Sequence, residues 1–111
     1  MVTPEIYIEA NAPTAAEGAL QLLFWHGEPW ETTVGRSIEH AAQYGVPRGE
    51  YRARIMQYLW PALESPEGLA DLLRHNMWHS PGPQNVKAYL ARDWETDLTP
   101  AQILAVIRGN M

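Results

Sequence analysis

The stretch that decides the fold runs from residue 50 to residue 79 and reads EYRARIMQYLWPALESPEGLADLLRHNMWH. Apolar residues recur in it at every fourth position from Tyr51 to Leu63, a spacing that aligns them along one side of a helix. Burying each such side chain contributes roughly 1.5–3 kcal/mol, so we expect this face to anchor the core. Pro61 interrupts the pattern, because proline has no amide hydrogen and its ring clashes with the carbonyl four residues back. The helix is therefore expected to kink at Pro61 or to end near Trp60.

A second helix is expected to follow directly. Ser65 can cap it, Pro66 suits the first helical position, and Glu67 is favourable in the first turn. Its apolar stripe consists of Leu69, Leu72, Leu73 and Met77. The stretch thus predicts two consecutive helices with a bend between them, and we expect the other segments to fold onto the apolar ridge from Tyr51 to Leu73.

The composition indicates one folded domain covering residues 1–111. Hydrophobic residues make up 46% of the chain and charged residues 19%, a balance typical of a globular protein. The chain has no cysteine, which excludes disulfides, thiolate metal sites and a cysteine nucleophile. Apolar runs are shorter than a membrane span and the N-terminus lacks a signal pattern, so we expect a cytoplasmic protein without membrane contact. The net charge of −5 argues against nucleic acid as a partner.

The first residues predict an extended segment. Residues 5–9 (EIYIE) alternate polar and apolar side chains, as a strand does. Since no partner strand is evident later in the chain, this segment would pair with its copy in a homodimer, add to a partner's sheet, or lie on the helices. Residues 11–13 (NAP) are expected to end it. The capping-box pattern Thr14–Glu17 is then expected to start the first helix, which Gly27 stops.

Three further helices are predicted from local signals. One starts at Thr32 or Thr33 and ends at Gly45. Another follows the loop at residues 80–83 (SPGP), and its apolar face consists of Val86, Tyr89, Leu90 and Trp94. The last begins with the capping box Thr99–Gln102, and its apolar face consists of Ile103, Leu104 and Ile107. Together these signals predict an all-α fold, a compact bundle of about five or six short helices with a short extended N-terminal segment.

Five tryptophans in 111 residues is a high count. Trp25 and Trp30 flank the turn HGEP, and Trp78 falls opposite Leu69 on its helix, which makes Trp78 the best candidate for an exposed indole. Any single tryptophan fills a core more often than not, at roughly two to one, but tryptophan is also enriched at binding hot spots. We therefore predict that Trp25, Trp30 and Trp78 contribute to a partner-binding surface.

A metal site is one alternative. Asp71, His75 and His79 are spaced by four on one predicted helix, and imidazole and carboxylate groups are suitable ligands for zinc or non-haem iron. Three residues at this spacing span about 12 Å along a straight helix, however, so they do not easily converge on one ion. A metal-dependent enzyme using His75 and His79 would need further ligands from elsewhere in the chain. The plainer interpretation is a polar flank beside the leucine stripe, and we expect no cofactor.

A helix-turn-helix is the other alternative. Residues 38–55 (IEHAAQYGVPRGEYRARI) place an alanine four residues before a glycine and then a second helix, which is the outline of that DNA-binding motif. Arg48, Arg52 and Arg54 could then contact the phosphates or base edges of DNA. Tyr51 already commits the second helix to the core, and the plainer interpretation is a helical hairpin with solvated arginines.

The leading hypothesis is a small non-catalytic protein-interaction module that binds another protein, a second copy of itself, or both, with a homodimer expected. No nucleophile–base–acid set can be read, and no carboxylate pair stands out as acid and base. An adaptor, an assembly factor or an inhibitor, including one encoded on a mobile element, fits this size. The segment DLTPAQILAVIRG (residues 97–109) resembles the endings of phage tail-assembly chaperones over the length of one capped helix.

Overall fold

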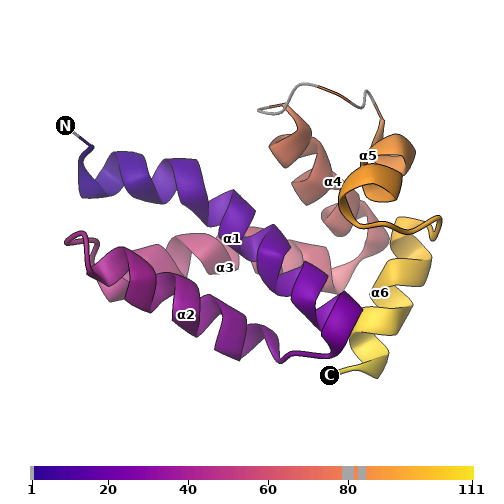
Figure 1. Ribbon diagram of the computed structural model, residues 1–111, viewed down its shortest axis with the longest axis horizontal. Coiled ribbons are helices and arrows are strands. Elements are labelled where there is room, and N and C mark those ends of the chain that lie inside the picture. The colour runs from indigo at the N-terminus through magenta and orange to yellow at the C-terminus, as the bar shows by residue number, and fades with distance from the viewer. Residues whose placement is uncertain (1, 79–81, 83–84) are drawn as a thin grey trace.

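The computed structural model describes residues 2–78, 82 and 85–111, and in that part of the chain it contains six α-helices and no strand (Figure 1). The helices are α1 (Pro4–His26), α2 (Trp30–Ala42), α3 (Arg48–Glu64), α4 (Pro66–Met77), α5 (Val86–Asp93) and α6 (Pro100–Gly109). The predicted all-α bundle is confirmed. None of the helices so described is both long and apolar enough to cross a membrane.

The N-terminal segment is helical, not extended as predicted. Residues 5–9 form the first turns of α1, which Thr3 caps with its Oγ1, the acceptor of a 3.2 Å hydrogen bond from the amide three residues on. Ile8 is buried, and the Tyr7 ring packs edge-on against Tyr51 of α3, with 5.7 Å between the ring centroids. Five alternating residues fit one helical turn as well as a strand, and the contact with α3 decides between them.

α1 also continues through the positions expected to break it. Pro13 lies inside the helix, where it removes one backbone hydrogen bond. Ala12 and Ala16 are fully buried on the same part of the helix, so packing of this face outweighs the lost bond. Thr14 and Glu17 therefore lie in the middle of α1 rather than in a capping box at its start.

Two long helices share the centre of the fold. α1 crosses the face toward the viewer in Figure 1 and contacts α2, α3, α4 and α6, while α3 lies behind it and contacts α1, α2 and α4. The predicted ridge is buried, as shown by Tyr51, Ile55, Leu59, Leu63, Leu69, Leu72 and Leu73. The ridge is a hub as expected, but it shares that role with α1.

The junction between α3 and α4 is a close contact between two helices. α3 does not end near Trp60 but continues through Pro61 to Glu64. The Ser65 Oγ accepts a hydrogen bond from the Gly68 amide at 3.0 Å, which confirms the predicted cap of α4. Gly68 lies directly against the Pro61 carbonyl, and a Cβ added to Gly68 would overlap that oxygen. Glycine at this position lets α4 turn back tightly onto α3.

α6 docks at the end of the bundle, as its short apolar face predicts. Its capping box is present, and its buried residues are Ile103, Leu104 and Ile107. Arg108 Nη2 donates to the carbonyls of Leu63 and Glu64, at 3.0 and 2.8 Å, and so satisfies carbonyls at the C-terminal end of α3. Asn110 Nδ2 donates to the Leu23 carbonyl in the same way at 2.9 Å. The C-terminal segment therefore ties together the ends of α1 and α3.

Candidate functional site

The structure separates the three tryptophans singled out as partner-binding residues. Trp25 is 41% exposed near the end of α1, and Trp78 is 87% exposed just after α4. Trp30 is only 8% exposed, because its indole packs edge-on against Trp60, with 5.4 Å between the ring centroids. Trp60 itself is 47% exposed. Trp30 is thus a core residue, and Trp60 has the surface position that we expected of Trp30.

Two of the three arginines of the predicted helix-turn-helix, Arg48 and Arg54, lie near carboxylates. Arg48 forms an ion pair with Glu39, with its Nε 2.9 Å from Oε1. Arg52 is exposed one turn further along α3. Arg54 lies in a hollow between α1 and α3 whose acidic residues are Glu5, Glu9 and Glu50. A DNA phosphate approaching this region would therefore meet a paired arginine and several carboxylates rather than an open basic patch.

Two of the three residues of the metal-site alternative, Asp71 and His75, lie in the described part of the chain. The Asp71 Oδ1 pairs with the Arg74 Nη1 at 3.0 Å, and the His75 ring lies against the Tyr58 ring, with 5.3 Å between centroids. His79, the other proposed ligand, lies outside the described residues. Within the described ranges, no three His, Asp or Glu side chains gather where they could hold a metal ion.

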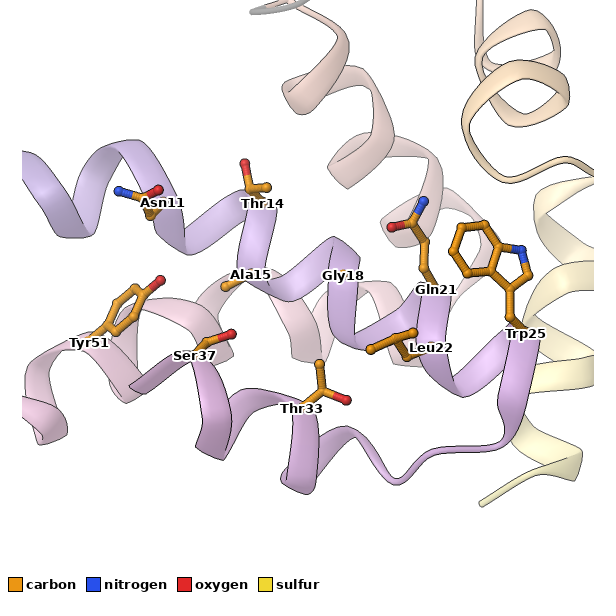
Figure 2. Close-up of a pocket in the computed structure, with 10 residues that line it drawn as sticks. All are labelled: Asn11, Thr14, Ala15, Gly18, Gln21, Leu22, Trp25, Thr33, Ser37 and Tyr51. Carbon is orange, nitrogen blue, oxygen red and sulfur yellow. The ribbon is translucent and has the colours of Figure 1, made fainter. Parts of the chain in front are cut away.

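A shallow hollow of about 450 Å³ runs between α1 and α2, with Tyr51 at one end and Trp25 at the other (Figure 2). We call it the α1–α2 groove, and its lining residues are Asn11, Thr14, Ala15, Gly18, Gln21, Leu22, Trp25, Thr33, Ser37 and Tyr51. Thr33 and Ser37 rise toward α1 from α2, as Figure 2 shows. The groove therefore presents one face of α1 with a polar border supplied by α2.

All the lining residues of the α1–α2 groove that the structure describes are uncharged. Burial, together with the neighbouring Tyr7, raises the pKa of Tyr51 to about 12, so its hydroxyl stays neutral as well. Between Ala10 and Trp25 the one charged residue is Glu17, and its side chain is buried. Charged side chains normally cover the exposed face of a helix, so this neutral face is distinctive on a chain with a net charge of −5.

The residues at the Trp25 end of the groove are held by hydrogen bonds to the last residue of α5 and to the residue after it. Gln21 Nε2 donates to the Asp93 carbonyl at 3.2 Å, and Trp25 Nε1 donates to the Trp94 carbonyl at 2.9 Å. Both side chains are therefore held in place by contacts within the fold.

Elsewhere on α1, the carboxylate of Glu17 is 5% exposed and lies at the centre of a polar network. It accepts hydrogen bonds from Asn76 Nδ2 at 2.6 Å, from the Tyr89 hydroxyl at 2.7 and 3.0 Å, and from Trp94 Nε1 at 3.0 Å. The amide NH₂ of Asn76 and the indole N–H of Trp94 can only donate hydrogen bonds. The side chain at position 17 must therefore accept them, as a carboxylate does. Burial and the hydrogen bond to Glu17 raise the pKa of Tyr89, which keeps its hydroxyl protonated as the third donor.

Sequence reasoning missed this network because its members are far apart in the chain. Asn76 lies 59 residues from Glu17, and Trp94 lies 77 residues from it. The signal that could have found it was Glu17 itself, a single acid in an otherwise uncharged run, which the capping-box interpretation placed at a helix start instead.

Comparisons with known protein families, with curated proteins and with solved structures gave no match. A function must therefore follow from the geometry of the chain itself. Of the two features on α1, the Glu17 network is closed off from solvent, whereas the α1–α2 groove is accessible to another molecule.

Proposed function

We propose that this protein is a small non-catalytic interaction module that binds another protein chain through the α1–α2 groove. The observation that carries this proposal is an open groove with an uncharged lining on a chain with a net charge of −5. The cores of protein–protein interfaces are depleted of charged residues relative to the rest of the surface. The groove has that composition along about 21 Å of α1, at a rise of about 1.5 Å per residue from Asn11 to Trp25.

The groove offers a partner both apolar contact and hydrogen bonds. Leu22 and Trp25 are the larger apolar residues in it, and tryptophan is among the residues that contribute most to binding at interfaces. Asn11, Thr14 and Ser37 add donors and acceptors beside them. Because the Trp25 indole is already held by its hydrogen bond to the Trp94 carbonyl, binding would order few additional side chains.

A binding role fits the groove better than a catalytic role. Among its hydroxyl groups, that of Thr33 donates to the Glu28 carboxylate at 2.7 Å. Hydrogen bonds from Arg36 and Thr33 lower the pKa of Glu28 to about 2, which is far too low for a general base near neutral pH. The buried Glu17 faces three donors in the core instead of the groove.

The proposal is tested by placing a charge in the groove without disturbing the fold. Gly18→Glu suits this purpose, because a Cβ at Gly18 meets nothing within 4 Å and glutamate is a better helix former than glycine. Gly35→Glu in α2 is the matched control, since Gly35 has equally open surroundings and does not line the groove. The wild type and both variants are immobilised and exposed to an extract of the source cells, and the captured proteins are identified by mass spectrometry.

Each captured protein is then purified and bound again to the three chains, so that the interaction is measured between known components. We expect the wild type and Gly35→Glu to bind with similar affinity and Gly18→Glu to bind at least tenfold more weakly, about the effect of 1.4 kcal/mol. Equal binding by all three chains would overturn the assignment of the groove as the binding surface.

A further inference from the structure

We propose that the chain which occupies the α1–α2 groove is a second copy of this protein, with the two α1 helices antiparallel and crossing at Gly18. This inference rests on the proposed function, because it names the partner for the same groove. Four observations carry it: the order of side-chain sizes along α1, the charge of the surface, the space beside Gly18 and the area of the face.

Side-chain size changes along the groove in a way that suits antiparallel self-pairing. Before Gly18 the α1 residues of the groove are small or short, namely Asn11, Thr14 and Ala15. After Gly18 they are larger, namely Gln21, Leu22 and Trp25. The two sets lie at matching sequence separations on either side of Gly18. A two-fold axis at Gly18 therefore sets each small residue of one copy against a larger residue of the other, with Asn11 opposite Trp25.

The charge distribution favours a second copy at this groove over other parts of the surface. In a two-fold interface the same patch faces itself, so a patch with an excess of one sign of charge is repelled by its copy. The charged residues that line the hollow between α1 and α3 are Glu5, Glu9, Glu50 and Arg54, so acidic side chains outnumber the one basic side chain and two copies of this hollow would repel each other. The lining of the α1–α2 groove is uncharged, so two acidic chains can meet there without that penalty.

Gly18 leaves room for another helix to approach closely. A Cβ added to Gly18 has no atom of the described chain within 4 Å beyond its own surroundings in the helix. Helix axes pack about 8–10 Å apart, and the smallest residues at the crossing give the shortest separations. A crossing of Gly18 on Gly18, with Ala15 beside it, therefore allows backbone contact at the centre while Leu22 and Trp25 provide contact on either side.

The face that carries the groove is large enough for a dimer. The molecule measures 39 × 31 × 20 Å, and Figure 1 looks down the shortest axis at the face on which α1 and α2 lie. A standard interface covers about 800 Å² on each partner, and the two larger dimensions, 39 and 31 Å, bound a face of that order. Contact confined to α1 and α2 falls at the lower end of interface sizes, so we expect a dimer that dissociates on dilution.

The test is sedimentation velocity of the purified full chain across a roughly hundredfold dilution series, since association follows mass action. The wild type and the Gly35→Glu control are expected to shift from the 12.6 kDa monomer to twice that mass as concentration rises. Gly18→Glu and Gly18→Lys, each alone, are expected to remain monomeric.

A wild type that stays monomeric throughout the series would overturn the second copy as partner. A Gly18→Glu or Gly18→Lys variant that dimerises like the wild type would overturn the crossing at Gly18. These failures are distinct from failure of the interaction module, because a monomeric chain can still capture another protein in a manner that Gly18→Glu abolishes.

The orientation of the two helices is tested by disulfide trapping, which the absence of native cysteine makes clean. Antiparallel α1 helices place Thr14 near Leu22 of the second copy, so a mixture of Thr14→Cys and Leu22→Cys should give a cross-linked heterodimer in mild oxidant. A disulfide needs the two Cα atoms about 4.4–6.8 Å apart, so each variant alone should cross-link poorly. Efficient cross-linking of Thr14→Cys to itself would indicate parallel helices and overturn the antiparallel arrangement.

Discussion

Glu17 and Gly18 are neighbours in α1, yet they meet opposite surroundings. The helix turns about 100° between them, since it has 3.6 residues per turn. Glu17 is buried and accepts hydrogen bonds from Asn76, Tyr89 and Trp94, which we call the sealed side of α1. Gly18 lies in the α1–α2 groove with open space beside it, which we call the open side.

The difference between the two sides separates what folds the chain from what is available for binding. On the sealed side, one carboxylate collects donors from α4, from α5 and from the residue after α5, which fixes the orientation of these segments on α1. On the open side, the small residues Ala15 and Gly18 leave α1 without a covering helix. Changes on the sealed side should therefore reduce stability, whereas changes on the open side should spare it.

The largest effect is expected from Glu17→Gln on the sealed side. Glutamine keeps the shape of the side chain but turns one acceptor into an NH₂ donor that faces other donors. A buried donor without an acceptor, together with weaker bonds to Asn76, Tyr89 and Trp94, should lower the free energy of unfolding by about 3 kcal/mol. Urea unfolding followed by tryptophan fluorescence measures this change.

Glu31→Gln is the matched control for that experiment, because Glu31 is an exposed residue in α2. This control should change the free energy of unfolding by less than about 0.5 kcal/mol, as exposed substitutions usually do. If Glu17→Gln and Glu31→Gln lowered the free energy of unfolding by the same small amount, the hydrogen bonds to Glu17 would not be stabilising the fold.

The next largest effect is expected from Gly68→Ala. This substitution tests whether the hydrogen bonds on the sealed side depend on the position of α4 against α3. The new methyl group would overlap the Pro61 carbonyl, so α4 must shift away from α3. Overpacking of this kind costs about 1–3 kcal/mol. Since Asn76 is on α4, the shift should also loosen its bond to Glu17. Thermal unfolding measures the loss, and an unchanged melting temperature would contradict the close contact.

The same substitution on the open side should act in the opposite direction. Gly18→Ala places a methyl group in free space inside a helix, and alanine is about 0.8–1.0 kcal/mol more favourable than glycine there. We expect the free energy of unfolding of the monomer to rise by about 0.5–1 kcal/mol, measured by urea unfolding at a concentration where the wild type is monomeric. A loss of stability would mean that Gly18 is already packed against the rest of the chain.

The features of this molecule that the sequence predicts correctly are those that depend on residues close together in the chain. The ridge on α3 is visible as a four-residue period, and the caps at Ser65 and Thr99 satisfy amides only three residues away. The start of α1 was predicted wrongly because five residues do not distinguish a strand from a helical turn, and the packing of Tyr7 on Tyr51 settles the matter.

The candidate site depends more on long-range contacts, and less of it could be predicted. Trp25 and Trp78 were expected at the surface and are exposed, but Trp30 is covered because α3 brings Trp60 against it. The local sequence does not place either the Glu17 network or the α1–α2 groove. Both arise from the way α2, α4 and α5 dock around α1, which periodicity does not specify.

The smallest effect concerns Glu28, an accessible carboxylate that contrasts with the buried Glu17. Its Oε1 lies 2.6 Å from the Arg36 Nη1, and it also accepts a hydrogen bond from Thr33 at the edge of the groove. These hydrogen bonds lower its pKa from 4.5 to about 2. Above the unfolded value of 4.5 the carboxylate is ionised in both states, so its stabilisation of the fold is complete.

As the pH falls from 4.5 towards 2, the unfolded chain takes up this proton before the folded chain does, so the contribution of Glu28 is progressively lost. Glu28→Gln should therefore be slightly less stable than the wild type at neutral pH and should approach it as the medium is acidified. Urea unfolding of both chains across this pH range measures the difference, which salt should also reduce because the pair is exposed. If the difference in the free energy of unfolding between the two chains stayed constant from neutral to acid pH, the Arg36 and Thr33 contacts would not favour the ionised carboxylate. The ion pair at this edge of the groove would then contribute nothing to stability.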